Sequence, residues 1–238
     1  MTIYLILIIT VLFSGSLVFL LKADNDRVLK FLLAFSGAFL IGLTFLKLIP
    51  EVFAKPGLLT GLFVLLGFLL QLGLELMTEG AEHGHHHQHS DDERVSPFLL
   101  LLGLCIHSFL EGMPIVESFD TKVQHTLVLG IVVHNIPISL TLMSLFLHYG
   151  LTRTKALLYL LVFALMTPLG SMLGNLMESN ITASLEVYFN YILAVVIGIF
   201  LHVSTSILFE TEENHRYNLQ KFITVVGGLA VAFGISLL

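Results

Sequence analysis

Residues 125–148 read HTLVLGIVVHNIPISLTLMSLFLH, a run of apolar residues that contains no Lys, Arg, Asp or Glu. A helix of about 20 apolar residues crosses the hydrocarbon core of a bilayer, so this run is long enough to span. It is too long for a strand of a membrane β-barrel, whereas a helix satisfies its own backbone hydrogen bonds in lipid. The stretch therefore predicts a membrane helix with two polar residues, His134 and Asn135, near mid-depth.

Comparable runs recur on both sides of this stretch, separated by polar or turn-forming residues. We place the eight spans at 3–21, 28–49, 57–77, 97–116, 125–148, 155–177, 187–209 and 220–238. The first run lacks a basic flank and a convincing cleavage site, which favours a retained helix over a signal peptide. The prediction is an all-α membrane protein: a bundle of eight transmembrane helices forming one transmembrane domain over 1–238, with a loop at 78–96.

The composition agrees with a protein whose solvent is the bilayer. Apolar residues make up 56% of the 238 positions and charged residues 12%, where a soluble protein carries about 25% charged. The mean hydropathy is +0.93. No basic tract favours a nucleic-acid partner. Cys105 is the only cysteine in the sequence, so disulfides are excluded within the chain and a packing role is expected for it.

The basic residues predict the orientation of the bundle. One set of alternate loops and helix ends carries Lys22, Arg27, Lys30, Arg94, Arg153, Lys155, Arg216 and Lys221. The other set carries Lys55 and Lys122. Because positive residues concentrate on the cytoplasmic side, the first set is expected there, with both termini outside.

Ionisable side chains inside the fourth and fifth spans indicate a functional site, because charged groups at mid-membrane depth are costly. His107 and Glu111 are four residues apart and share one helix face. The antiparallel fifth span brings His134 and Asn135 to a similar depth. Imidazole nitrogen and carboxylate oxygen suit Zn²⁺ and also Fe²⁺ or Mn²⁺.

Each of these two spans also contains a proline just beyond its polar pair. Proline removes the hydrogen bond to the carbonyl four residues earlier. Pro114 is therefore expected to release the carbonyl of Leu110, and Pro137 that of Val133. Bent helices with free carbonyls at the midplane are a recurrent way to line an ion pathway.

Each of these polar residues, taken alone, also fits a structural role. His107 fits a hydrogen-bonded packing residue, and with Glu111 it fits a buried ion pair that joins helices. Ser108 and Asn135 fit polar contacts between helices. The coincidence of both pairs at one depth favours a metal site.

The connection between the third and fourth spans, residues 79–96, reads EGAEHGHHHQHSDDERVS and is expected on the cytoplasmic side. Its imidazoles are His83, His85, His86, His87 and His89. Such a tract binds zinc or similar ions without a fixed geometry. A solvated linker or an engineered tag would also be His-rich, although the internal, Gly-interrupted run is unlike a tag.

The strings HSFLEG at 107–112 and HNIP at 134–137 resemble the paired signatures of the ZIP (Zrt/Irt-like) family of divalent metal transporters. KLIPE at 47–51 is similar to that family's His-Leu-Leu-Pro-Glu, and TPLG at 167–170 to its Glu-Pro-x-Gly. The resemblance extends over most of the chain. It implies eight helices, a homodimer, and transport of zinc or of Fe²⁺, Mn²⁺ or Cd²⁺ without an organic cofactor. The compact chain suggests a divergent bacterial-type member in the inner membrane.

The resemblance also implies a two-metal site, with His107, Glu111 and His134 on the transported ion and Ser108 and Asn135 lining a second. The sequence departs from this pattern at three positions. Ile138 and Thr167 stand where the family commonly has Glu, and Lys47 replaces a His. Because a second cation would lack anionic ligands to offset its desolvation, we predict one ion in the core.

Further candidates lie outside this centre. His202, near the middle of the seventh span, is a possible additional ligand or proton acceptor, or a packing residue. Acidic residues and a histidine near the membrane surfaces are candidates for cation entrance or exit: Glu51, Glu117, Asp120, Glu210 and His215.

The predicted function is transport of a divalent ion toward the cytoplasm by alternating access, with protons competing for the ligands. The sequence contains no GxxxxGK[ST] phosphate loop, which excludes that mode of ATP coupling. A membrane metal sensor that has lost transport remains an alternative. An intramembrane metalloenzyme is disfavoured because HExxH is absent.

Overall fold

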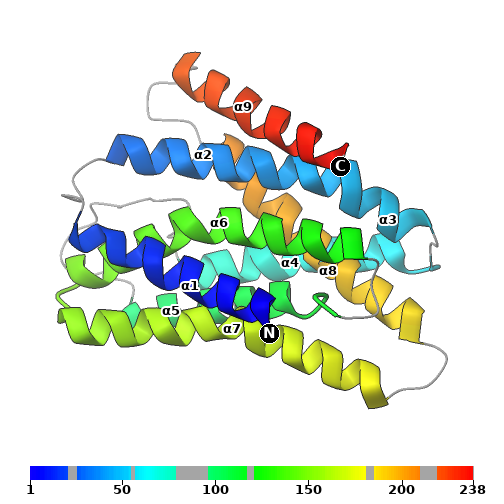
Figure 1. The fold of residues 1–238 in the computed structure, drawn as a ribbon, viewed down its shortest axis with the longest axis horizontal. Coiled ribbons are helices and arrows are strands. Elements are labelled where there is room, and N and C mark those ends of the chain that lie inside the picture. Colours follow the sequence, from blue (N-terminus) through cyan, green and yellow to red (C-terminus); the bar gives the residue numbers. More distant parts are fainter. Residues whose placement is uncertain are drawn as a thin grey trace.

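A computed structural model describes residues 1–20, 26–54, 57–78, 96–116, 121–180, 185–209 and 219–237, and every regular element in these ranges is helical (Figure 1). The helices are α1 (Thr2–Ser16), α2 (Asp26–Leu43), α3 (Ile49–Ala54), α4 (Thr60–Thr78), α5 (Pro97–Gly112), α6 (Thr121–His148), α7 (Arg153–Asn180), α8 (Leu185–Phe209) and α9 (Leu219–Ser236). A 3₁₀ turn, η1 (Leu17–Phe19), extends α1, and a π-helical segment, η2 (Thr44–Leu48), joins α2 to α3.

The eight predicted spans correspond to eight helical segments in the described ranges, because α2, η2 and α3 run on as one. Seven of these segments are long and apolar enough to cross a membrane. This confirms the all-helical fold. The side of the membrane on which the termini lie remains a prediction.

The fourth span is shorter than predicted, because its helix, α5, ends at Gly112 and not at residue 116. Pro114 has no N–H to continue the helical hydrogen bonds, and the helix ends just before it, although Met113 itself keeps helical backbone angles. The expectation that Pro114 would release the carbonyl of Leu110 is wrong: that carbonyl accepts a hydrogen bond from the Met113 N–H at 3.2 Å. By contrast, α6 continues through Pro137, which lies inside the helix.

Helices α5 and α6 each pack against other helices of the bundle. Helix α6 packs against α1 and α2, while α5 packs against α7 and α4, and α4 in turn packs against α8. Helix α9 lies at the edge of the bundle alongside α2 (Figure 1).

Glycines allow a close contact between α5 and α7. A methyl group at Gly112 would overlap the carbonyl oxygen of Thr167, and one at Gly170 would overlap that of Phe109. Small residues of this kind let backbones approach in lipid, where no hydrophobic drive brings helices together. The approach fixes the end of α5 that carries Glu111.

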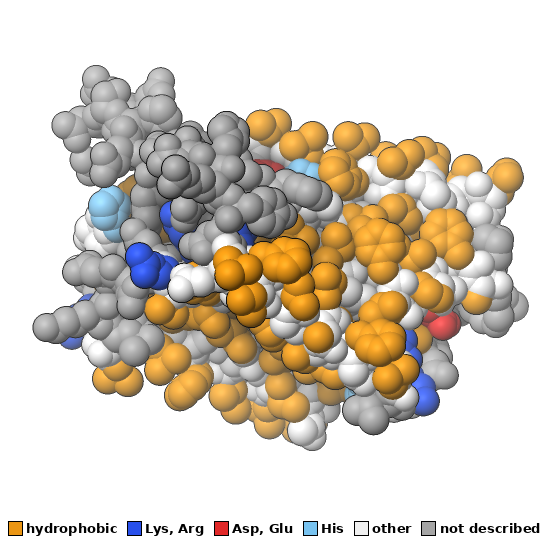
Figure 2. Space-filling view, turned by 90° about the horizontal axis from the view of Figure 1, so that it is seen from above, with side chains coloured by type: hydrophobic (Ala, Val, Ile, Leu, Met, Phe, Trp, Pro, Cys, Tyr) orange, Lys and Arg blue, Asp and Glu red, His pale blue; other side chains and the backbone are white. Residues whose placement is uncertain are grey.

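The outer surface is suited to lipid. Hydrophobic side chains cover the middle of the face in Figure 2, and the Lys and Arg side chains that are visible lie toward its two ends. Exposed leucines and phenylalanines concentrate on α4, α7 and α9. Exposed apolar surface of this extent is typical of a protein that contacts lipid, so this distribution agrees with a multi-pass membrane protein.

Candidate metal centre between α5 and α6

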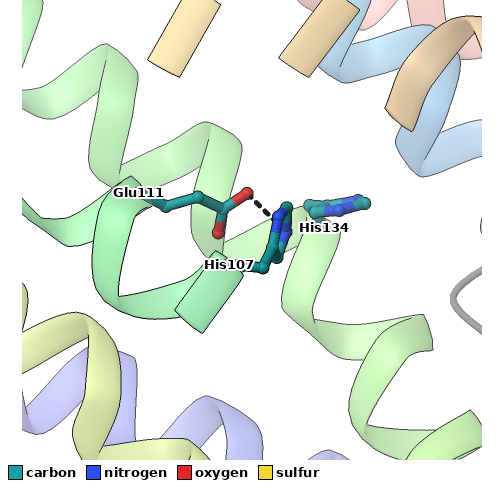
Figure 3. A group of neighbouring side chains, drawn as sticks. All are labelled: His107, Glu111 and His134. Carbon is teal, nitrogen blue, oxygen red and sulfur yellow. Dashed lines mark ion pairs between the residues drawn. The ribbon is translucent and has the colours of Figure 1, made fainter. Parts of the chain in front are cut away.

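His107, Glu111 and His134 come together in the interior as the one group of three or more His, Cys, Asp or Glu side chains among the described residues that could hold a metal ion. One ligand atom of each lies within 4.8 Å of the others, and all three side chains are fully buried. Figure 3 shows the Glu111 carboxylate and the His134 ring, which come from different helices, on either side of the His107 imidazole. The sequence predicted this convergence.

The contact within α5 is the tightest of the group. His107 Nε2 lies 2.9 Å from Glu111 Oε1, one helical turn away. The rings of His107 and His134 are 6.2 Å apart at their centroids and inclined by 70°. The second carboxylate oxygen, Glu111 Oε2, is buried and has no hydrogen-bond partner in the part of the chain that the structure describes. A buried carboxylate oxygen of this kind is costly unless a cation or donor compensates it.

Gln71, on α4, contacts the His107 ring at Nδ1, the nitrogen that does not face Glu111. Its Oε1 lies 2.8 Å from His107 Nδ1, and the amide is fully buried. Because an amide oxygen only accepts hydrogen bonds, Nδ1 must carry the proton in this contact. In neutral imidazole the lone pair then lies on Nε2, the atom that faces Glu111. Ligating histidines are commonly held in this way by a partner on their other nitrogen.

A tetrahedral zinc ion with bonds near 2.1 Å separates its ligand atoms by about 3.4 Å. His107 Nε2 and Glu111 Oε1 are 2.9 Å apart, and one ligand atom of each of the three residues lies within 4.8 Å of the others, so the group is small enough to surround one ion. Two imidazoles and one carboxylate leave one position for water. The donor set therefore fits a divalent ion of the zinc type.

The side chains expected to line a second ion are uncharged. Ser108 Oγ lies 2.7 Å from Thr167 Oγ1, so these two hydroxyls are satisfied by one another. Asn135 is buried on α6, and its Oδ1 has no hydrogen-bond partner within the described ranges. Ile138 is 1% exposed and packs in an apolar cluster that includes Val11 and Phe163. None of these described side chains is a carboxylate that would offset a second cation.

His202, on α8, does not join the group of His107, Glu111 and His134. Its Nε2 lies 3.3 Å from Glu75 Oε2 on α4, and its ring packs edge-on against Phe68 at 4.7 Å. The role of His202 as a metal ligand remains a prediction, and the structure places the Glu75 carboxylate next to it.

The entrance and exit candidates are only partly described. Glu51 is exposed on the short helix α3. Glu117, Asp120, Glu210 and His215 lie outside the described residues, as do His83, His85, His86, His87 and His89.

Gln71 and Glu75 are two residues that the sequence motifs did not single out. They lie four residues apart on α4, so they share one face of an otherwise apolar helix. This spacing, and the cost of placing polar groups in a membrane helix, are the signal that could have revealed them.

Comparison with known proteins supports the same interpretation. The family described as "ZIP Zinc transporter" matches residues 79–236, about two thirds of the chain. The chain is similar to zinc transporter ZIP9-B of Xenopus laevis, with 32% identity over 158 residues that cover 61% of this chain and 52% of that protein.

Two other relatives are more distant. Protein zntD of Dictyostelium discoideum is 29% identical over 171 residues, which are 64% of this chain and 25% of that protein. Zinc transporter ZIP13 of Pongo abelii is 29% identical over 232 residues, which are 88% of this chain and 67% of that protein. The chain spans about half the length of the first curated relatives it matches. Because the family matches about two thirds of the chain and the fold is helical, the chain belongs to the ZIP zinc transporter family.

Proposed function

We propose that this protein carries a divalent metal ion, zinc above all, across the membrane through the site between α5 and α6. The observation that supports this is the fully buried group of His107, Glu111 and His134. A carboxylate and two imidazoles sealed from solvent are costly to keep unless an ion uses them. Fe²⁺, Mn²⁺ and Cd²⁺ suit the same donors and are the competing substrates.

We propose that the ion moves toward the cytoplasm. With the basic connections in the cytoplasm, the ion enters from outside, exchanges its water for the three side chains, and leaves toward the cytoplasm as the helices rearrange. Glu51, Glu117 and Asp120 would collect cations on the outer side, and Glu210 and His215 would attract them on the inner side. The His-rich connection would bind ions at the cytoplasmic surface. We propose a homodimer in a cell inner membrane.

The direct test is ion flux into vesicles that contain the purified protein. Zn²⁺ uptake is expected to exceed uptake by protein-free vesicles, and parallel assays with Fe²⁺, Mn²⁺ and Cd²⁺ rank the substrates. A protein that binds zinc but gives no flux above empty vesicles would be a sensor, and the transport proposal would be wrong.

Replacing Gln71 is expected to weaken zinc binding, because the His107 imidazole loses the partner that keeps its proton on Nδ1. The Gln71→Leu variant should bind zinc about 10- to 100-fold more weakly, the range measured for partners of metal-bound histidines. Gln71→Glu, which keeps an acceptor oxygen in place, should bind more tightly than Gln71→Leu. Isothermal titration of zinc into the purified variants measures both. Equal affinities for Gln71→Leu and wild type would contradict this role.

Restoring a carboxylate at position 138 tests the one-ion interpretation. Ile138→Glu is expected to raise the number of core-bound zinc ions or their affinity, because it supplies the missing anionic ligand. The matched Ile138→Gln variant should do neither. Since Ile138 lies in an apolar cluster, the Glu variant should also be less thermally stable than wild type without metal and recover with zinc. Unchanged zinc stoichiometry and affinity in Ile138→Glu would count against the one-ion interpretation.

A further inference from the structure

Glu75 and His202 form a second carboxylate–imidazole pair inside the bundle, contributed by α4 and α8. Glu75 Oε2 lies 3.3 Å from His202 Nε2. The His202 side chain is 5% exposed and that of Glu75 is 23% exposed, whereas the side chains of His107 and Glu111 are fully buried. Both pairs offer an oxygen and a nitrogen to a cation, but only the Glu75 pair has partial access from outside the protein interior.

The pair lies one helical turn from the core site along α4. Gln71 contacts His107, and Glu75 follows four residues later on the same face, a rise of about 6 Å. Helix α5 runs antiparallel to α4 at this level, since Gly103 approaches Leu74 and Thr78 while His107 approaches Gln71. Glu75 is therefore closer than the core site to the end of α4, where the His-rich connection begins in the sequence.

Helix α8 ends at the same side. Tyr191 stacks on Phe63 in the first part of both helices, and His202 contacts Glu75 further along both, so α4 and α8 run parallel. With both helices ending on one side, the Glu75–His202 pair lies between the core site and that side of the bundle. In the predicted orientation this is the cytoplasmic side.

We propose that Glu75 and His202 form a second binding position for a divalent cation, which the ion occupies between the core site and the cytoplasm. This rests on the proposed function of the core site. A carboxylate oxygen and an imidazole nitrogen are ligands for zinc-type ions, and water completes the shell. With two protein ligands the position binds more weakly than the core site, as a site that releases its ion requires.

A purely structural ion pair that holds α4 to α8 is the alternative. The two helices are already in close contact through the backbone approaches at Gly67 and Gly198, which do not involve Glu75 or His202. A polar contact is therefore not needed to bring them together, and a structural pair would leave metal binding unchanged when it is removed.

Cadmium titration of the full-length protein in lipid nanodiscs distinguishes these two roles. All proteins in the comparison carry Ser in place of His83, His85, His86, His87 and His89, so that the loop contributes no imidazole. The parent is expected to show a tight and a weak class of Cd²⁺ binding. Glu75→Gln and His202→Gln should each weaken the weak class by about tenfold or more and leave the tight class unchanged. His107→Ala should remove the tight class.

The control variants replace the same residue types elsewhere: Glu178→Gln on α7 and His148→Gln at the end of α6. Both should reproduce the parent isotherm. A weak class that survives in both Glu75→Gln and His202→Gln, or a parent with the tight class alone, would overturn this inference and leave the core site intact. A tight class that survives in His107→Ala would instead contradict the proposed function. Thermal unfolding of each variant confirms that the compared proteins are folded.

Discussion

Vesicles that contain the His107→Ala or the Glu111→Ala variant are expected to take up Zn²⁺ at least about a hundredfold more slowly than vesicles with wild-type protein. Each substitution removes a direct ligand, and losing even an indirect partner of a metal ligand costs 10- to 100-fold in affinity or activity. Glu111 is also the one carboxylate in the group, so its loss leaves two imidazoles with no negative charge to offset the ion. Flux is measured with a zinc-sensitive dye inside the vesicles.

Two further variants make this result specific. Glu111→Gln keeps the size of the side chain and removes only its charge, so it should be as impaired as Glu111→Ala. His125→Ala removes an imidazole at the exposed start of α6 and should transport normally. If His107→Ala and Glu111→Ala both transport at the wild-type rate, the transport site lies elsewhere in the protein.

Adding a single methyl group at Gly112 is expected to unfold or strongly destabilise the bundle. In the Gly112→Ala variant the new Cβ would overlap the carbonyl oxygen of Thr167, a backbone atom that cannot rotate away. Overpacking typically costs about 1–3 kcal/mol, and a rigid backbone contact places this variant at or above the upper end. Because Gly112 follows Glu111, the displaced helix end should also lower zinc affinity.

Gly73→Ala on α4 is the matched control, since a Cβ there meets nothing within 4 Å. Alanine is a better helix former than glycine by about 1 kcal/mol, so this variant should be as stable as wild type or slightly more stable. Thermal unfolding in the same detergent compares the two. Equal melting temperatures for Gly112→Ala and Gly73→Ala would show that α5 and α7 do not approach as closely as described.

Much of the fold could be predicted because the bilayer imposes it. Long uncharged runs must be helices in lipid, which is why the stretch at 125–148 sufficed to indicate α6. The convergence of His107, Glu111 and His134 was also accessible, since helical spacing and the antiparallel order of two adjacent spans bring them to one depth. The end of α5 could not be predicted in this way, because the apolar sequence continues past Pro114 whereas the helix ends at Gly112.

The partners of the site were harder to foresee, because they depend on which helices are neighbours. Gln71 contacts His107 since α4 packs against α5, and Glu75 contacts His202 since α4 packs against α8. A hydropathy profile does not show which helices pack against one another. The sequence placed polar residues on α4, but only the tertiary arrangement shows that one face of this helix contacts both histidines.

The most direct test of the central claim is zinc X-ray absorption spectroscopy on the protein with the loop histidines replaced by Ser and one Zn²⁺ bound per chain. The spectrum should contain two imidazole ligands with nitrogen and oxygen atoms near 2.0–2.1 Å, as zinc bound by His107, Glu111 and His134 requires. The His134→Ala variant should retain one imidazole. A wild-type spectrum without imidazole, or a His134→Ala spectrum that still contains two, would contradict the assignment of the ion to this site.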